Sequence, residues 1–427
     1  MRRKFFLHIL FSLLALLSVR AQPAPDADPA KVRMETFAHV WNTINEKHFD
    51  PTFGGVDWKQ IGREYEPRVL SAKSDDEFYA VLQEMLGELN QSHFGIVPPN
   101  AQISATSFGE GEIGIEIQLI DGQFIVTRVE PSSPAAKAGL KTGYALEKID
   151  GRSIREILAP LEEKLAARRD TGPKKMLYRE RAVMTALGGK IGSLVTVEAR
   201  DAGNKNRVFK IERAAYEGER SAPFGNFPSQ RVIFESKILP ENIGYIRFNV
   251  WVIPQIEKLK QAVASMKDTQ AIIFDLRGNP GGIGGMANSL AGLLFDKNTS
   301  LGTMRYRNGE VSFAVFPKAD SYTGKIVILT DYATASTSEV FAAGMQETGR
   351  ARIVGERTAG AVLPSVMEKL PTGALFQYAV ADYKTPKKIL IEGRGVIPDV
   401  EVKLTRESLL EGRDLQIEAA VQEIIEK

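Results

Sequence analysis

The sequence predicts an α+β protein of several domains, with a helical N-terminal unit, a middle domain of short strands and an α/β C-terminal core. The prediction rests on changes in hydrophobic period along the 427 residues. Apolar residues first recur every three to four positions, then alternate in short runs, and finally form alternating strand and helix segments. We place these units at residues 22–103, 104–214 and 230–407, followed by a C-terminal helix over 408–427.

The composition is that of a globular protein and excludes several function classes. Hydrophobic residues make up 43% of the chain, and the net charge of +2 leaves no basic surface of the kind that binds nucleic acid. The chain has no cysteine, which excludes disulfides, thiol chemistry and thiolate metal sites. We expect neither a metal nor a cofactor.

The first 21 residues have the pattern of a secretory signal. Arg2, Arg3 and Lys4 precede an apolar run over 5–19, and Val19-Arg20-Ala21 supplies small residues for cleavage after Ala21. The run is shorter than the roughly 20 residues that span a bilayer. We expect an exported protein, periplasmic or extracellular, with no stable membrane anchor after cleavage.

Two helices are predicted in the N-terminal unit. One begins near Val32 and carries apolar residues at helical spacing, and the other begins at a capping box formed by Ser74 and Glu77. Their apolar faces consist of Phe37, Val40, Trp41 and Ile44, and of Phe78, Leu82, Met85 and Leu89.

Three histidines remain once the signal is removed: His39, His48 and His93. The first two belong to the first predicted helix, where a structural role is the simpler interpretation. His93 lies in a loop between a helix and a strand, from which an imidazole can reach into a cleft. If the protein needs a histidine base, His93 is the candidate.

The middle domain begins with strands over 113–117 and 123–129 and continues through the turn Ser133-Pro134-Ala135 and the hairpin Ile149-Asp150-Gly151. This order resembles a PDZ domain, and a purely structural β-domain is the alternative. The resemblance implies that backbone N–H groups near Ile113, Gly114 and Ile115 bind peptide C-termini, with the peptide added as a strand. A charged helical insertion over 154–181, expected to be a solvated face, and strands over 194–197 and 208–211 complete the domain.

The core is predicted to alternate strands and helices, as in α/β layering. Its elements are expected at 243–248 (strand), 256–266 (helix), 271–274 (strand), from about 286 (helix), 326–329 (strand), after 336 (helix) and 409–425 (amphipathic helix).

A turn of small residues, 333–339, joins the last predicted core strand to the helix that follows it. Such a turn places a hydroxyl beside the free N–H groups and positive dipole of a helix N-terminus, which suits a serine nucleophile. The alternative is that Ser336 or Ser338 is an ordinary N-cap.

The glycine-rich loop 278–285 follows a predicted strand, and residues 282–287 fit the dinucleotide pattern G-x-G-x-x-A. A dinucleotide site is disfavoured because the loop opens with Arg277-Gly278-Asn279-Pro280 and lies in the middle of the chain. Glycine turns also leave a backbone N–H bare beside a reacting carbonyl, and an oxyanion hole is therefore the favoured interpretation.

Several segments together resemble the C-terminal processing (tail-specific) peptidases and their tricorn-core relatives. They are the PDZ-like segment, F-D-L-R-G-N-P-G-G at 274–282, T-A-S-T-S-E at 334–339 and I-E-G-R-G-V-I-P-D at 391–399. The resemblance covers about 37–402 and implies a crotonase/ClpP-like α/β core. It implies Ser336 as the nucleophile and the N–H groups of Gly281 and Thr337 as oxyanion donors.

The processing branch of that family uses a lysine base in a T-x-G-K segment, but here the segment is Thr358-Ala359-Gly360-Ala361. The tricorn-like branch instead uses a histidine before the PDZ segment and a glutamate late in the core, which map to His93 and Glu392. An imidazole titrates near neutrality and can activate a serine hydroxyl, and a carboxylate can fix its tautomer.

The sequence therefore predicts a secreted serine endopeptidase with a Ser336, His93 and Glu392 triad, acting on unfolded or C-terminally recognised proteins and peptides. The alternative is a catalytically inactive peptide- or lipid-binding protein on the same scaffold. Homo-oligomerisation stays open.

Overall fold

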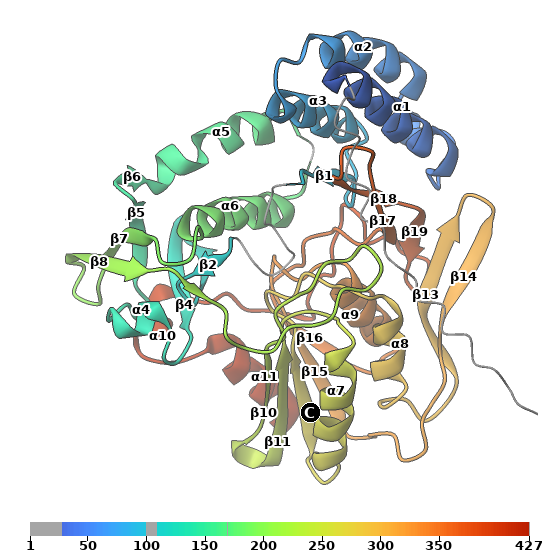
Figure 1. Ribbon diagram of the computed structural model, residues 1–427. Helices are drawn as coiled ribbons and strands as arrows, with labels where there is room; N and C mark the ends of the chain where they lie inside the picture. The colour runs from blue at the N-terminus through green and yellow to red at the C-terminus, as the bar shows by residue number, and fades with distance from the viewer. Residues whose placement is uncertain (1–27, 100–108, 169, 427) are drawn as a thin grey trace, which may run out of the picture.

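The computed structural model of the protein describes residues 28–99, 109–168 and 170–426, and Figure 1 shows its three parts. A group of helices lies at the top of the view, a strand-rich middle domain at the left and a layered core below. The predicted signal peptide, residues 1–21, lies outside the described residues. No helix of the described part is both long and apolar enough to cross a bilayer.

The N-terminal unit consists of three helices and a short 3₁₀ turn. They are α1 (Pro29–Lys47), η1 (Phe53–Gly55), α2 (Trp58–Ser71) and α3 (Asp75–Gly87). Helices α1 and α3 correspond to the two predicted helices. The sequence does not predict α2, because its buried apolar positions are few and widely spaced and Pro67 lies inside it.

This unit is joined to the C-terminal half of the chain by a small sheet. Its strands are β1 (Gly95–Val97), β17 (Ser365–Lys369) and β18 (Leu375–Ala379), in the order β1-β18-β17. Side chains of β18 such as Phe376 share one apolar cluster with Phe78 and Leu82 of α3. The loop between α3 and β1, which contains His93, is therefore anchored against the core.

The middle domain is built around an antiparallel sheet in the order β3-β4-β5-β7-β8, with β6 paired to β5. Its elements are β3 (Ile115–Ile120), β4 (Gln123–Val129), α4 (Pro134–Lys137), β5 (Ala145–Ile149), β6 (Arg152–Ser153), α5 (Ile154–Ala167), α6 (Gly172–Leu187), β7 (Leu194–Arg200) and β8 (Asn206–Glu212). The predicted helical insertion is thus two helices. A two-stranded ladder of β2 (Gly111–Glu112) and β9 (Ala214–Ala215) closes the domain.

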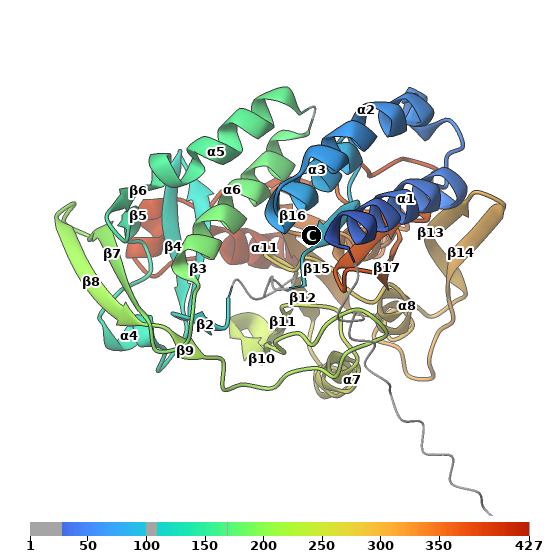
Figure 2. The same cartoon turned by 45° about the horizontal axis from the view of Figure 1, so that its top comes forward.

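One expectation for the insertion is wrong. Its charged run does not form a uniformly solvated face, because Lys174 is only 4% exposed. The Lys174 ammonium pairs with Asp170 at 2.8 Å, and α6 packs Leu177 against Tyr332 and Ala333 of the core. Figure 2 shows α5 and α6 on the same side of the molecule as the N-terminal helices.

The core sheet has the order β10-β11-β12-β15-β16-β20, with β10 antiparallel and the other neighbours parallel. The strands are β10 (Phe234–Leu239), β11 (Ile243–Phe248), β12 (Ala271–Asp275), β15 (Lys325–Thr330), β16 (Arg352–Gly355) and β20 (Val400–Glu401). A 3₁₀ turn, η2 (Pro240–Asn242), joins the first two strands. The predicted strands at 243–248, 271–274 and 326–329 lie in this sheet.

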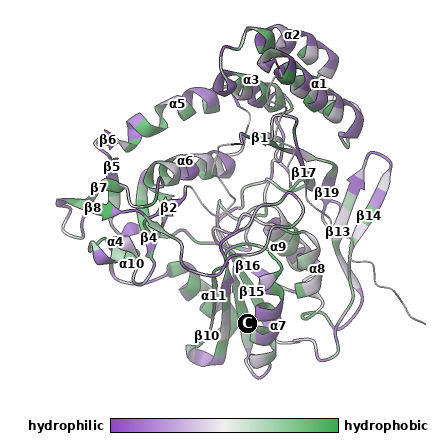
Figure 3. Ribbon diagram, in the orientation of Figure 1, coloured by the Kyte–Doolittle hydropathy of each residue, from purple (hydrophilic) through white to green (hydrophobic). Residues whose placement is uncertain are grey.

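Helices cover both faces of the core sheet. They are α7 (Pro254–Ser265), α8 (Gly285–Ala291), α9 (Thr337–Glu347) and α11 (Leu415–Ile425). Alternate residues of β12 pack to opposite sides: Ile272 and Phe274 on the side of α7, α8 and α9, and Ala271 and Ile273 on the side of α11. Burial on both faces explains the continuous apolar strand sequences, which Figure 3 shows in green.

Two further features complete the fold. A second antiparallel sheet of β13 (Thr299–Tyr306), β14 (Gly309–Val315) and β19 (Ala381–Lys384) lies beside the core, in the order β14-β13-β19. The predicted C-terminal helix over 408–427 is two helices, α10 (Arg406–Leu410) and α11, because Gly412 adopts a positive φ of 75° between them. Leu409 of α10 packs against Ile120 and Ile125 of the middle domain.

Candidate active site

Ser336 stands between the carboxyl end of β15 and the first residue of α9. Its backbone is unusual for a non-glycine residue, with φ 57° and ψ −121°. The backbone N–H of Ser336 donates to the carbonyl of Ala361 at 2.8 Å and to a Glu339 carboxylate oxygen at 3.1 Å. These bonds hold the turn in a strained conformation that presents the side chain at the edge of the sheet.

The glycine-rich loop follows β12, the strand next to β15, so the two loops meet at the same edge of the sheet. Asp331 ties them together: its Oδ1 accepts N–H groups from Gly278, Ala333 and Thr334 at 2.9–3.0 Å. Burial raises the pKa of Asp331, although these hydrogen bonds oppose the shift.

His93 and Ser336 lie together although 243 positions separate them in sequence. His93 Nε2 is 3.2 Å from Ser336 Oγ, and His93 Nδ1 is 2.7 Å from the hydroxyl oxygen of Ser92. His93 also has a positive φ, of 62°. The structure thus brings an imidazole to hydrogen-bonding distance of the serine hydroxyl.

Glu392 does not contact His93 directly but is linked to it through Ser92. The Ser92 hydroxyl donates to Glu392 Oε2 at 2.8 Å, and the Ser92 backbone N–H donates to Oε1 at 2.7 Å. Since the Ser92 proton is used on the carboxylate, His93 Nδ1–H must donate to Ser92 Oγ, which leaves Nε2 as an acceptor facing Ser336. Glu392 also accepts the N–H of Val362 at 3.0 Å.

Ser92 is the site residue that sequence reasoning missed. A small polar residue beside a histidine gives no periodic or spacing signal, and only the fold shows that its hydroxyl bridges to a carboxylate 300 positions away. His39 and His48 lie elsewhere: His39 Nε2 contacts Glu368 at 2.7 Å, and His48 Nε2 contacts Gln91 at 2.9 Å.

The imidazole of His93 is in a strongly shifted electrostatic environment. Burial, together with the positive charges of Lys174 and Arg181 on α6, lowers the pKa of His93 to about 4. The ring is therefore neutral at pH 7, as a general base must be. The same cations disfavour the imidazolium that forms once the ring accepts a proton.

Glu339 is fully buried directly behind Ser336. Its Oε1 accepts from the Thr358 hydroxyl and the Gly360 N–H, and its Oε2 accepts from the N–H groups of Ala361 and Ser336. Burial raises the pKa of Glu339 to about 7, against these hydrogen bonds. The carboxylate fixes the positions of Ser336 and of the segment 358–361.

Ala361 in this segment contributes backbone groups to the site. Its carbonyl accepts the Ser336 N–H, and its own N–H donates to Glu339. No cluster of three or more potential metal ligands occurs in the described part of the chain.

Gly281 and Thr337 both lie against Ser336. A Cβ atom on Gly281 would stand 2.6 Å from Ser336 Cβ and 2.9 Å from Thr337 N, and its φ is 96°, so only glycine fits. Thr337 is the first residue of α9, so its backbone N–H has no acceptor within the helix. The N–H of Gly281, in contrast, donates to Asn279 Oδ1 at 3.0 Å in this structure.

Ser338 has a different hydrogen-bond partner from Ser336. Its fully buried hydroxyl oxygen accepts the indole N–H of Trp251 at 2.8 Å. Of the two serines left open by the sequence, only Ser336 adjoins an imidazole in the described structure.

Ile113, Gly114 and Ile115 lie at the start of β3, the edge strand of the middle sheet. They line a small hollow together with Met184 and Leu187 of α6. The carbonyl of Gly114 accepts the N–H of Glu130 at 2.9 Å. A groove between an edge strand and a helix can accept an extended peptide.

The chain matches two family models: Peptidase family S41 over residues 242–402 and the tricorn protease C1 domain over residues 29–87. The carboxyl-terminal-processing protease of Synechocystis sp. is 26% identical over 98% of this chain and 93% of its own length. The solved photosystem II D1 C-terminal processing protease is 22% identical with a TM-score of 0.58, over 89% of this chain and 96% of its own. Mature CPAF complexed with lactacystin is 15% identical with a TM-score of 0.64, over 93% and 98%.

Proposed function

Because this chain is a serine peptidase of family S41, we propose that it hydrolyses peptide bonds with Ser336 as nucleophile and His93 as general base. One observation carries the proposal: Ser336 Oγ lies 3.2 Å from a His93 Nε2 whose opposite nitrogen is held by Ser92. That arrangement gives a neutral imidazole whose lone pair faces the serine hydroxyl.

In the proposed reaction Ser336 Oγ attacks the substrate carbonyl while its proton moves to His93 Nε2. The resulting imidazolium gives the same proton to the leaving amine as the C–N bond breaks, which leaves an acyl ester on Ser336. His93 Nε2 then takes a proton from a water that attacks the ester, and it gives that proton to Ser336 Oγ as the C–O ester bond breaks, which releases the new carboxyl terminus and restores the serine hydroxyl. Each proton taken up by His93 is thus returned within the same half-reaction.

Ser92 and Glu392 have positioning roles in this scheme. The Nδ1–H of His93 remains hydrogen-bonded to Ser92 Oγ throughout. The Ser92 hydroxyl in turn donates to the Glu392 carboxylate, so the negative charge of Glu392 polarises the Ser92 oxygen that faces the ring. Since Lys174 and Arg181 disfavour the imidazolium, negative charge delivered through Ser92 is needed to stabilise it.

The oxyanion of the tetrahedral intermediate is proposed to lie between the N–H groups of Thr337 and Gly281. The N–H of Thr337 lies at the positive end of the α9 dipole and is available to donate to the oxyanion. Gly281 N–H must first exchange its bond to Asn279 Oδ1 for one to the substrate. In this proposal the arrival of the substrate carbonyl completes the oxyanion hole.

The substrates are proposed to be unfolded or C-terminally recognised proteins and peptides, cleaved internally. The middle domain is proposed to act as a PDZ domain, supported by the edge strand β3, the glycine at position 114 with φ 76° and the neighbouring helix α6. The core is proposed to be of the crotonase/ClpP type. Residues 1–21 are proposed to direct export, and intact mass of the exported protein should correspond to cleavage after Ala21.

Two readouts test the proposed catalytic function. The purified mature protein should degrade casein and should be labelled by a fluorophosphonate, and Ser336→Ala should lose both while keeping its circular-dichroism spectrum. Ser338→Ala is the matched control, because it removes a neighbouring hydroxyl that faces Trp251 and should still be labelled. Equal labelling of Ser336→Ala, or no casein turnover by the parent protein, would contradict the proposal.

A further inference from the structure

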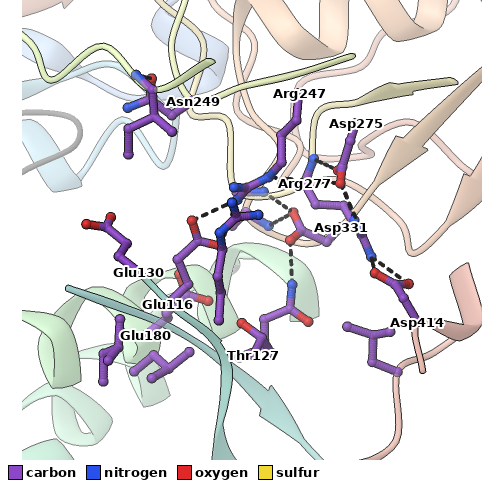
Figure 4. A pocket seen from close by; sticks show the side chains of 18 of the residues that line it. Glu116, Thr127, Glu130, Glu180, Arg247, Asn249, Asp275, Arg277, Asp331 and Asp414 are labelled. Atoms are coloured by element: carbon purple, nitrogen blue, oxygen red, sulfur yellow. Dashed lines mark hydrogen bonds and ion pairs between the residues drawn. The ribbon is translucent and has the colours of Figure 1, made fainter. Parts of the chain in front are cut away.

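A cavity of about 300 Å³ lies between the middle domain and the core. Its walls come from β3, β4 and α6 on one side and from β11, β12 and the loops that follow β12 and β15 on the other. Figure 4 shows side chains of both walls, with Glu116 of β3 bonded to Arg247 of β11. Many charged side chains line the cavity, so a charged group without a partner there could bind a ligand.

Nearly all the basic groups in the cavity wall have carboxylate partners. Those with partners within 4.0 Å are Arg128, Arg231, Lys237, Arg247 and Arg277. Arg181 of α6 also lines the cavity, but among the described residues it has neither an ion pair nor a side-chain hydrogen bond. Burial lowers the pKa of Arg181, which reflects the cost of leaving a guanidinium without an anion.

The adjacent carboxyl group of Glu180 does not serve as that anion. It accepts the hydroxyl of Tyr332 at 2.6 Å and forms no ion pair with Arg181. Burial also raises the pKa of Glu180 to about 8, so most of it is protonated at pH 7. The charge of Arg181 is therefore free to meet an anion that enters the cavity.

The surroundings of Arg181 suit a peptide. Leu177, Arg181 and Met184 lie on one face of α6, since their spacing is i, i+4 and i+7, and all three line the cavity. Ile115 and Ile117 of the edge strand β3 line it as well. Met184 and Ile115 also line the smaller hollow at Ile113 and Gly114, so a strand added to β3 passes both places.

The cavity also reaches the candidate active site. Pro280 and Ala333 line it, and they belong to the two loops that carry Gly281 and Ser336. The charge of Arg181 is one of the causes that lower the pKa of His93. An anion bound at Arg181 would therefore be felt electrostatically by the imidazole.

We propose that Arg181 is a specificity-determining residue that binds a carboxylate of the peptide substrate in this cavity. The inference rests on the proposed function only in taking the ligand to be a substrate. The carboxylate is either the free C-terminus or an Asp or Glu side chain, since a guanidinium binds both in the same bidentate way.

Binding to a variant that cannot turn over tests this directly. In the Ser336→Ala background, fluorescein-labelled ten-residue peptides are titrated by anisotropy in two matched pairs. One pair compares a free C-terminus with the C-terminal amide, and the other compares one internal Glu with one internal Gln in amidated peptides. At least one carboxylate peptide should bind about ten- to a hundredfold tighter than its neutral counterpart, as one charge-assisted contact provides. The form that benefits identifies the source of the carboxylate.

Arg181→Gln should abolish this preference and Arg181→Lys should keep part of it, while the matched control Lys175→Gln on the same helix should keep it fully. The proposal is overturned if the parent protein binds acid and neutral peptides equally, or if Arg181→Gln retains the full preference. Thermal melting of each variant shows that it is folded. Casein hydrolysis by the protein with Ser336 intact is scored separately, so that failure of the proposed catalytic function is distinguishable from failure of this one.

Discussion

Replacing Ser92 by alanine removes one oxygen atom and, with it, both hydrogen bonds that join the His93 ring to the Glu392 side chain. The bond from Nδ1–H to a neutral hydroxyl contributes about 0.5–1.5 kcal/mol, and the bond from that hydroxyl to a carboxylate about 1.5–3 kcal/mol. If both act fully in the transition state, their loss of about 2–4.5 kcal/mol lowers kcat/KM by about 30- to 2,000-fold.

The free energy of unfolding should be affected much less, because in the variant the Glu392 carboxylate still accepts hydrogen bonds from the backbone N–H groups of Val362 and of residue 92. The assay is kcat/KM on an internally quenched casein peptide, with thermal melting measured in parallel. Ser92→Thr, which retains the hydroxyl, should recover a large part of the activity. A Ser92→Ala enzyme within threefold of the parent protein would refute the bridging role of the Ser92 hydroxyl.

Three further predictions concern neighbouring groups. Gly281→Ala should reduce fluorophosphonate labelling of Ser336 by about a hundredfold or more, because the added Cβ would stand 2.6 Å from Ser336 Cβ at a positive φ. Labelling at the parent rate would exclude a close approach of the loops that carry Gly281 and Ser336. The acid limb of the kcat/KM profile should fall near pH 4 rather than near 6.5, because a lowered pKa keeps His93 neutral until the pH drops through that value. Arg181→Gln should move this limb to higher pH, since removing a cation favours the His93 imidazolium. An unmoved limb would count against the proximity of Arg181 to His93. Ser338→Ala should destabilise the protein by about 1–3 kcal/mol, because it leaves the buried Trp251 indole N–H without an acceptor, while labelling of Ser336 continues; an unchanged melting temperature would contradict that hydrogen bond.

Much of the fold could be predicted from the sequence because its patterns are local. The core strands at 271–274 and 326–329 are continuous apolar runs buried on both faces, and that burial leaves a direct trace in the sequence. Helix α2 leaves almost none, since only Trp58, Tyr65 and Val69 of its fourteen residues are buried. Its helical structure depends on packing against α1 and α3 rather than on its own pattern.

The candidate site divides in the same way. The serine turn and the glycine-rich loop could be located from strand, turn and helix-start patterns, and His93 from its loop position among three histidines. The choice of Ser336, Gly281, Thr337 and Glu392 depended on the resemblance of their segments to known motifs. The bridging hydroxyl of Ser92 and the buried Lys174 depend on contacts between distant segments, which no local pattern encodes. The bond from Gly281 N–H to Asn279 is likewise a property of the folded loop.

The most direct test of the proposed mechanism is the rate at which a fluorophosphonate acylates Ser336 in His93→Ala, measured by mass spectrometry with and without added imidazole. If His93 is the base, the substitution should slow acylation by at least a hundredfold and free imidazole should restore part of the rate. Acylation of Ser336 at the parent rate in His93→Ala, independent of imidazole, would contradict the pairing of these two side chains.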